Sequence, residues 1–213
     1  KSIATSGMLT AELKPGVIQA TLSGLLPDIL IPFTQAHSKI DVRIVRDHSV
    51  ALYQRVLDEE IDAAITSHPP FAMPKTCGWS LLREEPFVVL TAKSLRMRDP
   101  HEILARQPFI RLTRNVYAGQ FIDNYLRKVG LRPKELFELD GFEPIAMLVD
   151  RGLGVMLLPD WPPPWPEGLS LRKLPLPDPS FRRRIGRLWN RSSLRLKLIE
   201  ALVENAHATI KKK

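Results

Sequence analysis

The sequence predicts an α/β protein made of two Rossmann-like lobes. Short apolar runs typical of buried strands alternate with segments of helical periodicity through both halves of the 213-residue chain. Strands separated by helices of this length pair in parallel through right-handed crossovers. The composition, 44% hydrophobic and 25% charged, is that of an ordinary globular protein. Because no apolar run approaches the roughly 20 residues that would span a bilayer, we expect no membrane contact.

The first half alternates helical spacing with strand-like runs. Leu22, Leu26, Ile29 and Phe33 recur at helical intervals, and IDAAIT from Ile61 reads as a buried strand. The expected elements are a helix over 16–35, a strand over 42–46, a helix over 50–57, and strands over 61–66 and 87–91.

The second half repeats this organisation without repeating the sequence. Gly152 and Gly154 allow the backbone to reverse between a helix and the apolar run from Val155 to Leu158. The proline-dense segment 161–168 excludes a helix or a central strand and predicts a stiff surface loop. The expected elements are strands over 109–112 and 136–139, a helix over 117–129, the helix–turn–strand unit over 141–161, strands over 169–174 and 182–189, and a helix over 194–210.

Two α/β halves need a connection, which we place near residues 90–92, with a return near 187–190. The expected lobes are therefore 7–91 plus 190–213, and 92–189. A double crossover of this kind leaves a cleft between hinged lobes, which is the usual arrangement for capturing a small molecule.

The chain carries 31 Lys and Arg against 23 Asp and Glu, a formal charge of +8, which favours anionic partners. The excess is scattered, and its densest runs, Arg182 to Arg184 and Lys211 to Lys213, are typical of solvated faces. Cys77 is the only cysteine, which excludes an internal disulfide. That single cysteine and the lack of a secretory segment lead us to expect a cytoplasmic protein.

Catalytic and cofactor motifs are not evident. No nucleophile motif or P-loop occurs, and the G-x-G at 152–154 lacks the third glycine of a dinucleotide fingerprint. The five histidines are dispersed, and no histidine or cysteine has metal-site spacing. We therefore expect a protein that is not an enzyme and that carries no cofactor or metal. The histidines are His37, His48, His68, His101 and His207.

Five segments, in the same order, resemble the effector-binding domain of LysR-type transcriptional regulators. The resemblance implies a periplasmic-binding-protein-like (type II) fold that senses a small effector and meets DNA only through a winged helix-turn-helix, which has no counterpart in this sequence. The alternative is a free-standing bilobal solute-binding protein, which would need an export signal. The segments are LLP at Leu25 with Ile29, Leu30 and Phe33, then Val42 to Val45, LDEEIDAAI from Leu57, LREEPFVVL from Leu82, and GLGVMLLP from Gly152.

The first strand has two possible starts under this resemblance, Gly7 or Gly16. A start at Gly7 lengthens the following helix by about one turn, whereas a start at Gly16 shortens the loop after the strand. We favour Gly7, because an added turn preserves the buried face of the helix.

In this family the ligand lies between the lobes, beside strand ends and helix N-termini. By matching position, the first lobe offers Asp47, His48 and Ser49 after one strand, and Thr66 and Ser67 after the next. Asp47 and Ser49 are also ordinary N-cap residues, so capping alone would explain them.

The second lobe offers Thr113, Arg114 and Asn115 before a helix, and Glu143 at the start of the next. A helix N-terminus and a guanidinium suit a carboxylate, so we expect a small anionic effector. A solvated arginine and a first-turn acid are the ordinary alternatives. The resemblance also implies a homodimer or tetramer through the first lobe, in which the 16–35 helix of one subunit meets 50–58 of the other.

Overall fold

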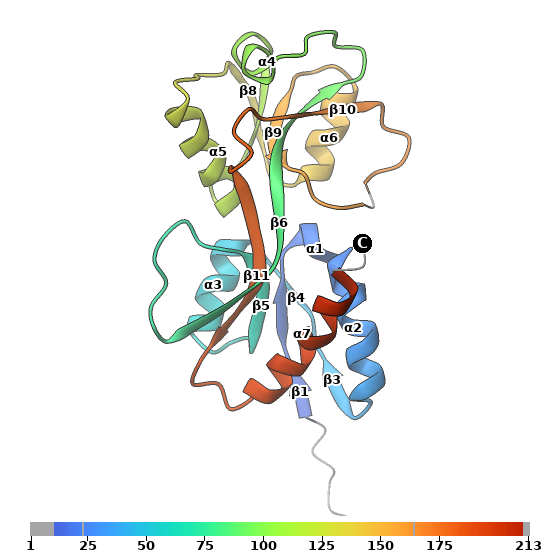
Figure 1. Ribbon diagram of the computed structural model, residues 1–213, viewed down its shortest axis with the longest axis vertical. Coiled ribbons are helices and arrows are strands. Elements are labelled where there is room, and N and C mark those ends of the chain that lie inside the picture. The colour runs from blue at the N-terminus through green and yellow to red at the C-terminus, as the bar shows by residue number, and fades with distance from the viewer. Residues whose placement is uncertain (1–10, 23, 164, 211–213) are drawn as a thin grey trace, which may run out of the picture.

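The computed structural model describes residues 11–22, 24–163 and 165–210. It shows two α/β lobes stacked end to end and joined by two long strands (Figure 1). The expected fold class, an α/β protein of two lobes, is confirmed. None of the helices in the described part of the chain has the length and apolar character that a membrane span requires.

Lobe I contains a sheet in which parallel strands are flanked by long antiparallel ones. Its strand order is β6-β11-β5-β2-β4, with β2 parallel to both β5 and β4. Lobe I is built from β1 (Ala11–Leu13), β2 (Pro15–Val17), α1 (Gln19–Leu22), α2 (Leu25–Ala36), β3 (Ile40–Val42), β4 (Val45–Arg46), α3 (Ser49–Leu57), β5 (Ala63–Ser67), the first part of β6 (Cys77–Ala92), β11 (Arg182–Asn190) and α7 (Leu196–Ile210).

The first described strands, β1 and β2, correct the expected helix over 16–35, but they do not decide between Gly7 and Gly16 as the start of the first strand. Gly16 lies inside β2, whose residues are all buried, and helix begins only at Gln19. A Cβ at Gly16 would stand 2.6 Å from side-chain atoms of Leu52 and Ile61, so this strand packs too closely for a side chain. Close packing against other elements of lobe I therefore favours a strand at Gly16, where helical spacing predicted a helix. Residues 7–9 lie outside the described residues.

The described strands of lobe II pair in both directions. β7 pairs in parallel with β8, whereas β9 and β10 run antiparallel to the upper part of β6, which departs from the parallel pairing expected throughout. Its elements are that part of β6, α4 (Pro100–Arg106), β7 (Phe109–Leu112), α5 (Tyr117–Lys128), β8 (Glu135–Leu139), α6 (Phe142–Asp150), β9 (Met156–Pro159) and β10 (Leu171–Pro175).

The division between the lobes does not fall at the expected residues. β6 is one continuous strand: residues 77–86 pair with β11, and residues 87–92 pair with β9 and β10. Leu82 belongs to the core of lobe I and Phe87 to the core of lobe II, so the chain crosses near Pro86. It returns at the start of β11, since Ile185 already lies in the first core. The boundaries at 91/92 and 189/190 fall inside β6 and β11, whose unbroken strand pattern gives no local signal of a crossing.

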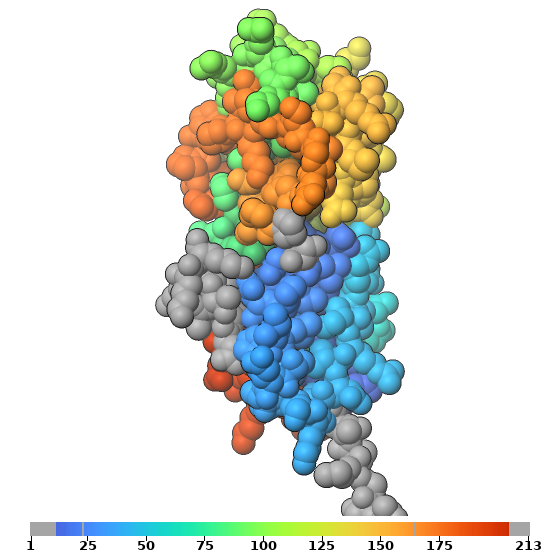
Figure 2. Space-filling model, turned by 90° about the vertical axis from the view of Figure 1, so that its right-hand side faces the viewer, coloured from blue at the N-terminus to red at the C-terminus, as the bar shows by residue number. Residues whose placement is uncertain are grey.

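The last helix returns to lobe I. α7 packs against α2, and its residues Ile199, Leu202 and Val203 are buried in the lobe I core. On the face shown in Figure 2, the segment around and after β9 stands directly above α1 and α2. The two lobes therefore face each other across a narrow junction, and this junction contains the site.

Candidate functional site

A cavity of about 420 Å³ lies between the lobes, and both lobes line it. Lobe I contributes the segments that follow β2 and β4 and the end of β5, while lobe II contributes the N-terminus of α6 and the segment after β9. The expected cleft at strand ends and helix N-termini is therefore present. Its lining is Ile18, Gln19, Ala20, Gly24, Arg46, Asp47, His48, Ser49, Ser67, Leu112, Val116, Ala118, Asp140, Gly141, Phe142, Glu143, Pro144, Trp161, Pro162 and Arg183.

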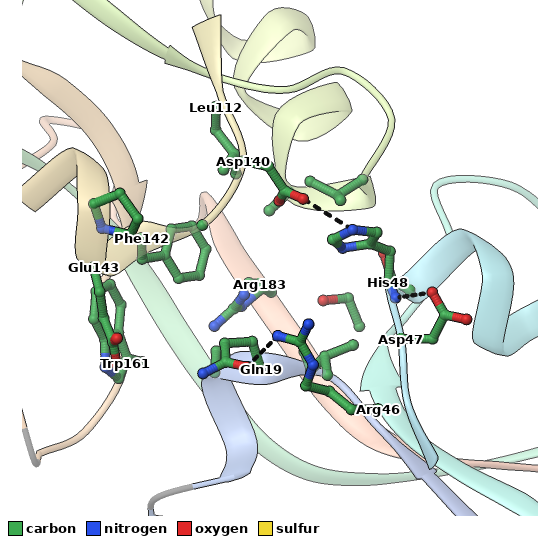
Figure 3. A pocket seen from close by; sticks show the side chains of 18 of the residues that line it. Gln19, Arg46, Asp47, His48, Leu112, Asp140, Phe142, Glu143, Trp161 and Arg183 are labelled. Atoms are coloured by element: carbon green, nitrogen blue, oxygen red, sulfur yellow. Dashed lines mark hydrogen bonds and ion pairs between the residues drawn. The ribbon is translucent and has the colours of Figure 1, made fainter.

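Arg46 supplies an exposed positive charge to this cavity. Its Nη1 donates a hydrogen bond to Oε1 of Gln19 at 2.7 Å, and both side chains face the pocket (Figure 3). Among the described residues, no carboxylate forms an ion pair with Arg46, so its charge is available to a ligand. Sequence reasoning missed Arg46, although it ends β4 directly before the predicted Asp47; the last residue of that strand was the available signal.

Aromatic rings form a flat apolar wall of the cavity. Phe142 stacks on Trp161 with ring centroids 4.8 Å apart, and Trp161 stacks on Trp165 at 4.0 Å. Nζ of Lys173 lies 3.7 Å from the centroid of the Trp165 ring, which covers the outer end of the stack. Trp161 is only 7% exposed, so the expected surface loop over 161–168 is wrong for this residue.

Four of the five residues predicted in the first lobe line the cavity: Asp47, His48, Ser49 and Ser67. Thr66 does not line it. Alternation along β5 turns the Thr66 side chain away from its neighbour Ser67, and Thr66 Oγ1 is buried without a hydrogen-bond partner among the described residues.

Two of these residues also hold the lobes together. Nε2 of His48 lies 2.9 Å from Oδ2 of Asp140, and Ser49 Oγ accepts a hydrogen bond from the backbone N–H of Tyr117 at 3.1 Å. Phe71 of lobe I adds an edge-to-face contact with Tyr117. Tyr117 is buried at this junction, and burial, followed by the influence of Tyr53, raises its pKa to about 12. The structure therefore has the lobes in contact at the N-termini of α3 and α5.

The residues predicted in the second lobe do not gather at the cavity. Glu143 lines it, at the first turn of α6, but Thr113, Arg114 and Asn115 do not. Asn115 is exposed, and its backbone N–H bonds Oγ1 of Thr113, which makes a local turn. This half of the predicted site is therefore corrected, except for Glu143.

Arg114 is occupied by acids of its own lobe. Its guanidinium contacts Asp123 at 2.9 Å, Glu135 at 3.1 Å and Glu138 at 3.0 Å. Arg111 pairs with Asp123 and Glu135 in the same cluster, and its hydrogen bond is the main cause that lowers the pKa of Glu135. These acids come from α5 and β8, so the sequence around Arg114 gave no sign of them.

The described residues offer no metal centre at the cavity. Among the described residues, no group of three His, Cys, Asp or Glu side chains could hold a metal ion. Cys77 is buried in lobe I, away from the cavity lining, and burial raises the pKa of its thiol. The arrangement is suited to holding a small molecule.

Comparisons with known proteins agree with this architecture. Residues 6–211 match the family model described as LysR substrate binding domain, so the chain belongs to that family, whose fold is the type II periplasmic-binding-protein-like fold. The chain is similar to two uncharacterized HTH-type transcriptional regulators of Bacillus subtilis (strain 168). YusT is 27% identical over 75% of this chain and 52% of its own length, and YybE is 27% identical over 85% of this chain and 64% of its own length. The chain thus spans between half and two thirds of these relatives.

Solved structures show the same fold at low sequence identity. The effector binding domain of QuiR in complex with shikimate superposes with a TM-score of 0.80 at 17% identity, covering 95% of this chain and 98% of that one. The BenM effector binding domain with its effector benzoate gives a TM-score of 0.78 at 19% identity, covering 95% and 93%.

Proposed function

We propose that this domain binds a small anionic effector between its lobes and thereby controls transcription through a helix-turn-helix DNA-binding domain. The observation that carries the proposal is the interlobe cavity, which both lobes line and which contains Arg46, a cation that no carboxylate of the described residues pairs with. The relatives named as HTH-type regulators support the role in transcription, and a cytoplasmic location is part of the same proposal. They favour it over a free-standing solute-binding protein.

The cavity suits a compact ring that bears a carboxylate. The stacked Phe142 and Trp161 offer apolar ring atoms to the ligand, and the N-termini of α3 and α6 border the same space. Helix N-termini and a guanidinium both favour negative charge. Shikimate and benzoate, the ligands of the two structural neighbours, are cyclic carboxylates of this kind.

Effector binding acts by shifting the balance between lobe arrangements. The contacts of His48 with Asp140 and of Ser49 with Tyr117 cross the junction beside the cavity. A ligand that touches both lobes favours the closed arrangement by its difference in affinity for the two states. That preference is what a DNA-binding domain outside this chain would read.

The test is a thermal-shift screen with carboxylates and their neutral counterparts. Benzoate and shikimate are compared with benzamide and methyl shikimate. A carboxylate present at 100 times its Kd stabilises the domain by about 2.7 kcal/mol. We expect a rise in Tm with at least one carboxylate and none with its neutral counterpart; no rise with either carboxylate would refute an anionic effector of this type.

Two variants locate the binding in the cavity. Ala20 lines it, so Ala20→Trp should fill the space and abolish the Tm rise. The control, Ala105→Trp, places the same side chain on the exposed face of α4 and should keep the rise. Equal responses of the two variants would place the ligand elsewhere.

Self-association through lobe I, as a homodimer or tetramer, is part of the same proposal. Of the apolar side chains of the first helices, Ile29 is buried in the lobe's own core, but Ile31 of α2 is 58% exposed and Val50 of α3 is also exposed. Sedimentation should show that Ile31→Lys weakens association while Leu153→Lys, an exposed apolar position in lobe II, does not. A wild-type domain that stays monomeric at high micromolar concentration would contradict the proposal.

A further inference from the structure

Three charged side chains meet where the two long strands pass between the lobes. Arg183 of β11 lies directly opposite Glu85 of β6, and Nε of Arg183 donates to Glu85 Oε2 at 2.7 Å, with Nη2 on the same oxygen. Arg83, two residues from Glu85 on the same face of β6, donates to Oε1 from Nε at 3.0 Å and from Nη2 at 2.5 Å. One carboxylate is therefore shared by two guanidinium groups.

This cluster is buried with an excess of one positive charge. Arg183 is 2% exposed and Glu85 1%, and the Arg83 side chain is 14% exposed. Burial is the main cause that lowers the pKa of the Arg183 guanidinium. Glu85 opposes this effect, whereas the like charge of Arg83 adds to it. An uncompensated buried charge is costly unless an opposite charge or a dipole meets it.

The unmatched charge faces the cavity. Arg183 belongs to the cavity lining, and Figure 3 shows it at the centre of the pocket, near Phe142 and Gln19. Its Nε and Nη2 are engaged by Glu85, whereas Nη1 has no acceptor among the residues that the structure describes. The guanidinium also lies 5.3 Å from the centroid of the Phe142 ring, the first ring of the aromatic wall. Reading 182–184 as a solvated charge run is therefore wrong for Arg183.

We propose that the effector's carboxylate binds Nη1 of Arg183 at the floor of the cavity, so that it neutralises the Arg83–Glu85–Arg183 cluster. Glu85 is a positioning residue, since it fixes the guanidinium plane without touching the ligand. The ring of the effector then lies along Phe142 and Trp161, and Arg46 with Gln19 contacts any further polar substituent near the rim. This assignment rests on the proposed function and specifies its ligand as a cyclic carboxylate, the class that benzoate and shikimate represent.

The test compares two arginine variants that remove the same charge. Arg183→Gln removes the donor that faces the cavity, whereas Arg83→Gln removes no cavity-facing donor and leaves the pair of Glu85 with Arg183. The probe is benzoate or shikimate, whichever gave the larger Tm rise, titrated calorimetrically into the domain. Arg183→Gln should weaken its binding by about ten- to a hundredfold. Arg83→Gln should weaken it less, and Arg114→Gln, which changes an arginine outside the cavity lining, should not change it.

The outcomes separate this inference from the proposed function. If a carboxylate binds the wild-type domain and Arg183→Gln binds it equally well, the Arg183 assignment is overturned while the effector-binding role stands. Binding that Arg83→Gln weakens as much as Arg183→Gln also overturns direct contact. If neither carboxylate binds the wild-type domain, both proposals fail. Should Arg183→Gln not fold, Arg183→Lys keeps the charge but loses the forked donors, and the same loss of affinity is expected.

Discussion

Neutralising Glu85 should lower the free energy of unfolding of this domain more than neutralising most of its other polar residues. Glu85→Gln keeps the shape of the side chain but leaves Arg83 and Arg183 as two like charges in a buried site. Removing one partner of a buried ion pair costs about 3–5 kcal/mol, because the remaining charge stays uncompensated. For a domain of this size, that loss lowers Tm by roughly 10 °C.

Arg83→Gln is the matched control for this prediction. It removes one charge from the same cluster but leaves Glu85 with Arg183, so the buried site becomes neutral. The two hydrogen bonds from Arg83 are lost, and we expect a cost of about 1–2 kcal/mol. The predicted order of stability is therefore wild type, then Arg83→Gln, then Glu85→Gln.

Urea unfolding at pH 7 measures this order. Tryptophans lie in both lobes, Trp79 and Trp189 in lobe I and Trp161 and Trp165 in lobe II, so fluorescence follows the whole domain. Coincident fluorescence and circular dichroism transitions would justify a two-state free energy. A Glu85→Gln variant no less stable than Arg83→Gln would show that the buried excess of positive charge is not real.

Three further outcomes follow from the structure. Gly78→Ala should lower the free energy of unfolding by about 1–3 kcal/mol, since the added Cβ would stand 2.1 Å from the Trp189 ring; an unchanged urea midpoint would contradict this packing. Arg114→Ala should cost less than about 1 kcal/mol, because its ion pairs with acids such as Asp123 are half-exposed, and should leave carboxylate affinity unchanged; calorimetric loss of affinity would return Arg114 to the site. Burial raises the pKa of Tyr117 to about 12, so the free energy of unfolding should be unaffected by this group below pH 10 and should fall as the pH rises from 10 towards 12. In Tyr117→Phe this alkaline loss of stability should shrink, and a pH profile identical to that of the wild type would argue against the raised pKa.

Much of the local structure could be read from the sequence. The apolar run at Phe109–Leu112 is a strand with the expected bounds, and the spacing after Tyr117 gives a helix that ends one residue before the predicted end. The loop Asp47 to Ser49 faces the cavity as predicted, because a loop between a strand and a helix N-terminus lies at the edge of the sheet where ligands bind. Five short segments in the family's order also indicated the family, which the match over residues 6–211 confirms.

The tertiary structure decided which of the other residues meet at the site. The crossing near Pro86 lies within one unbroken strand, so no change of periodicity marks it. Trp161 is buried because Phe142 stacks on it. Arg114 is turned from the cavity by acids of α5 and β8, whereas Arg183, read as part of a solvated run, lies buried opposite Glu85, 98 residues away in sequence. Periodicity reports which face of an element is apolar, but the charge and burial of a site depend on partners that only the folded chain brings together.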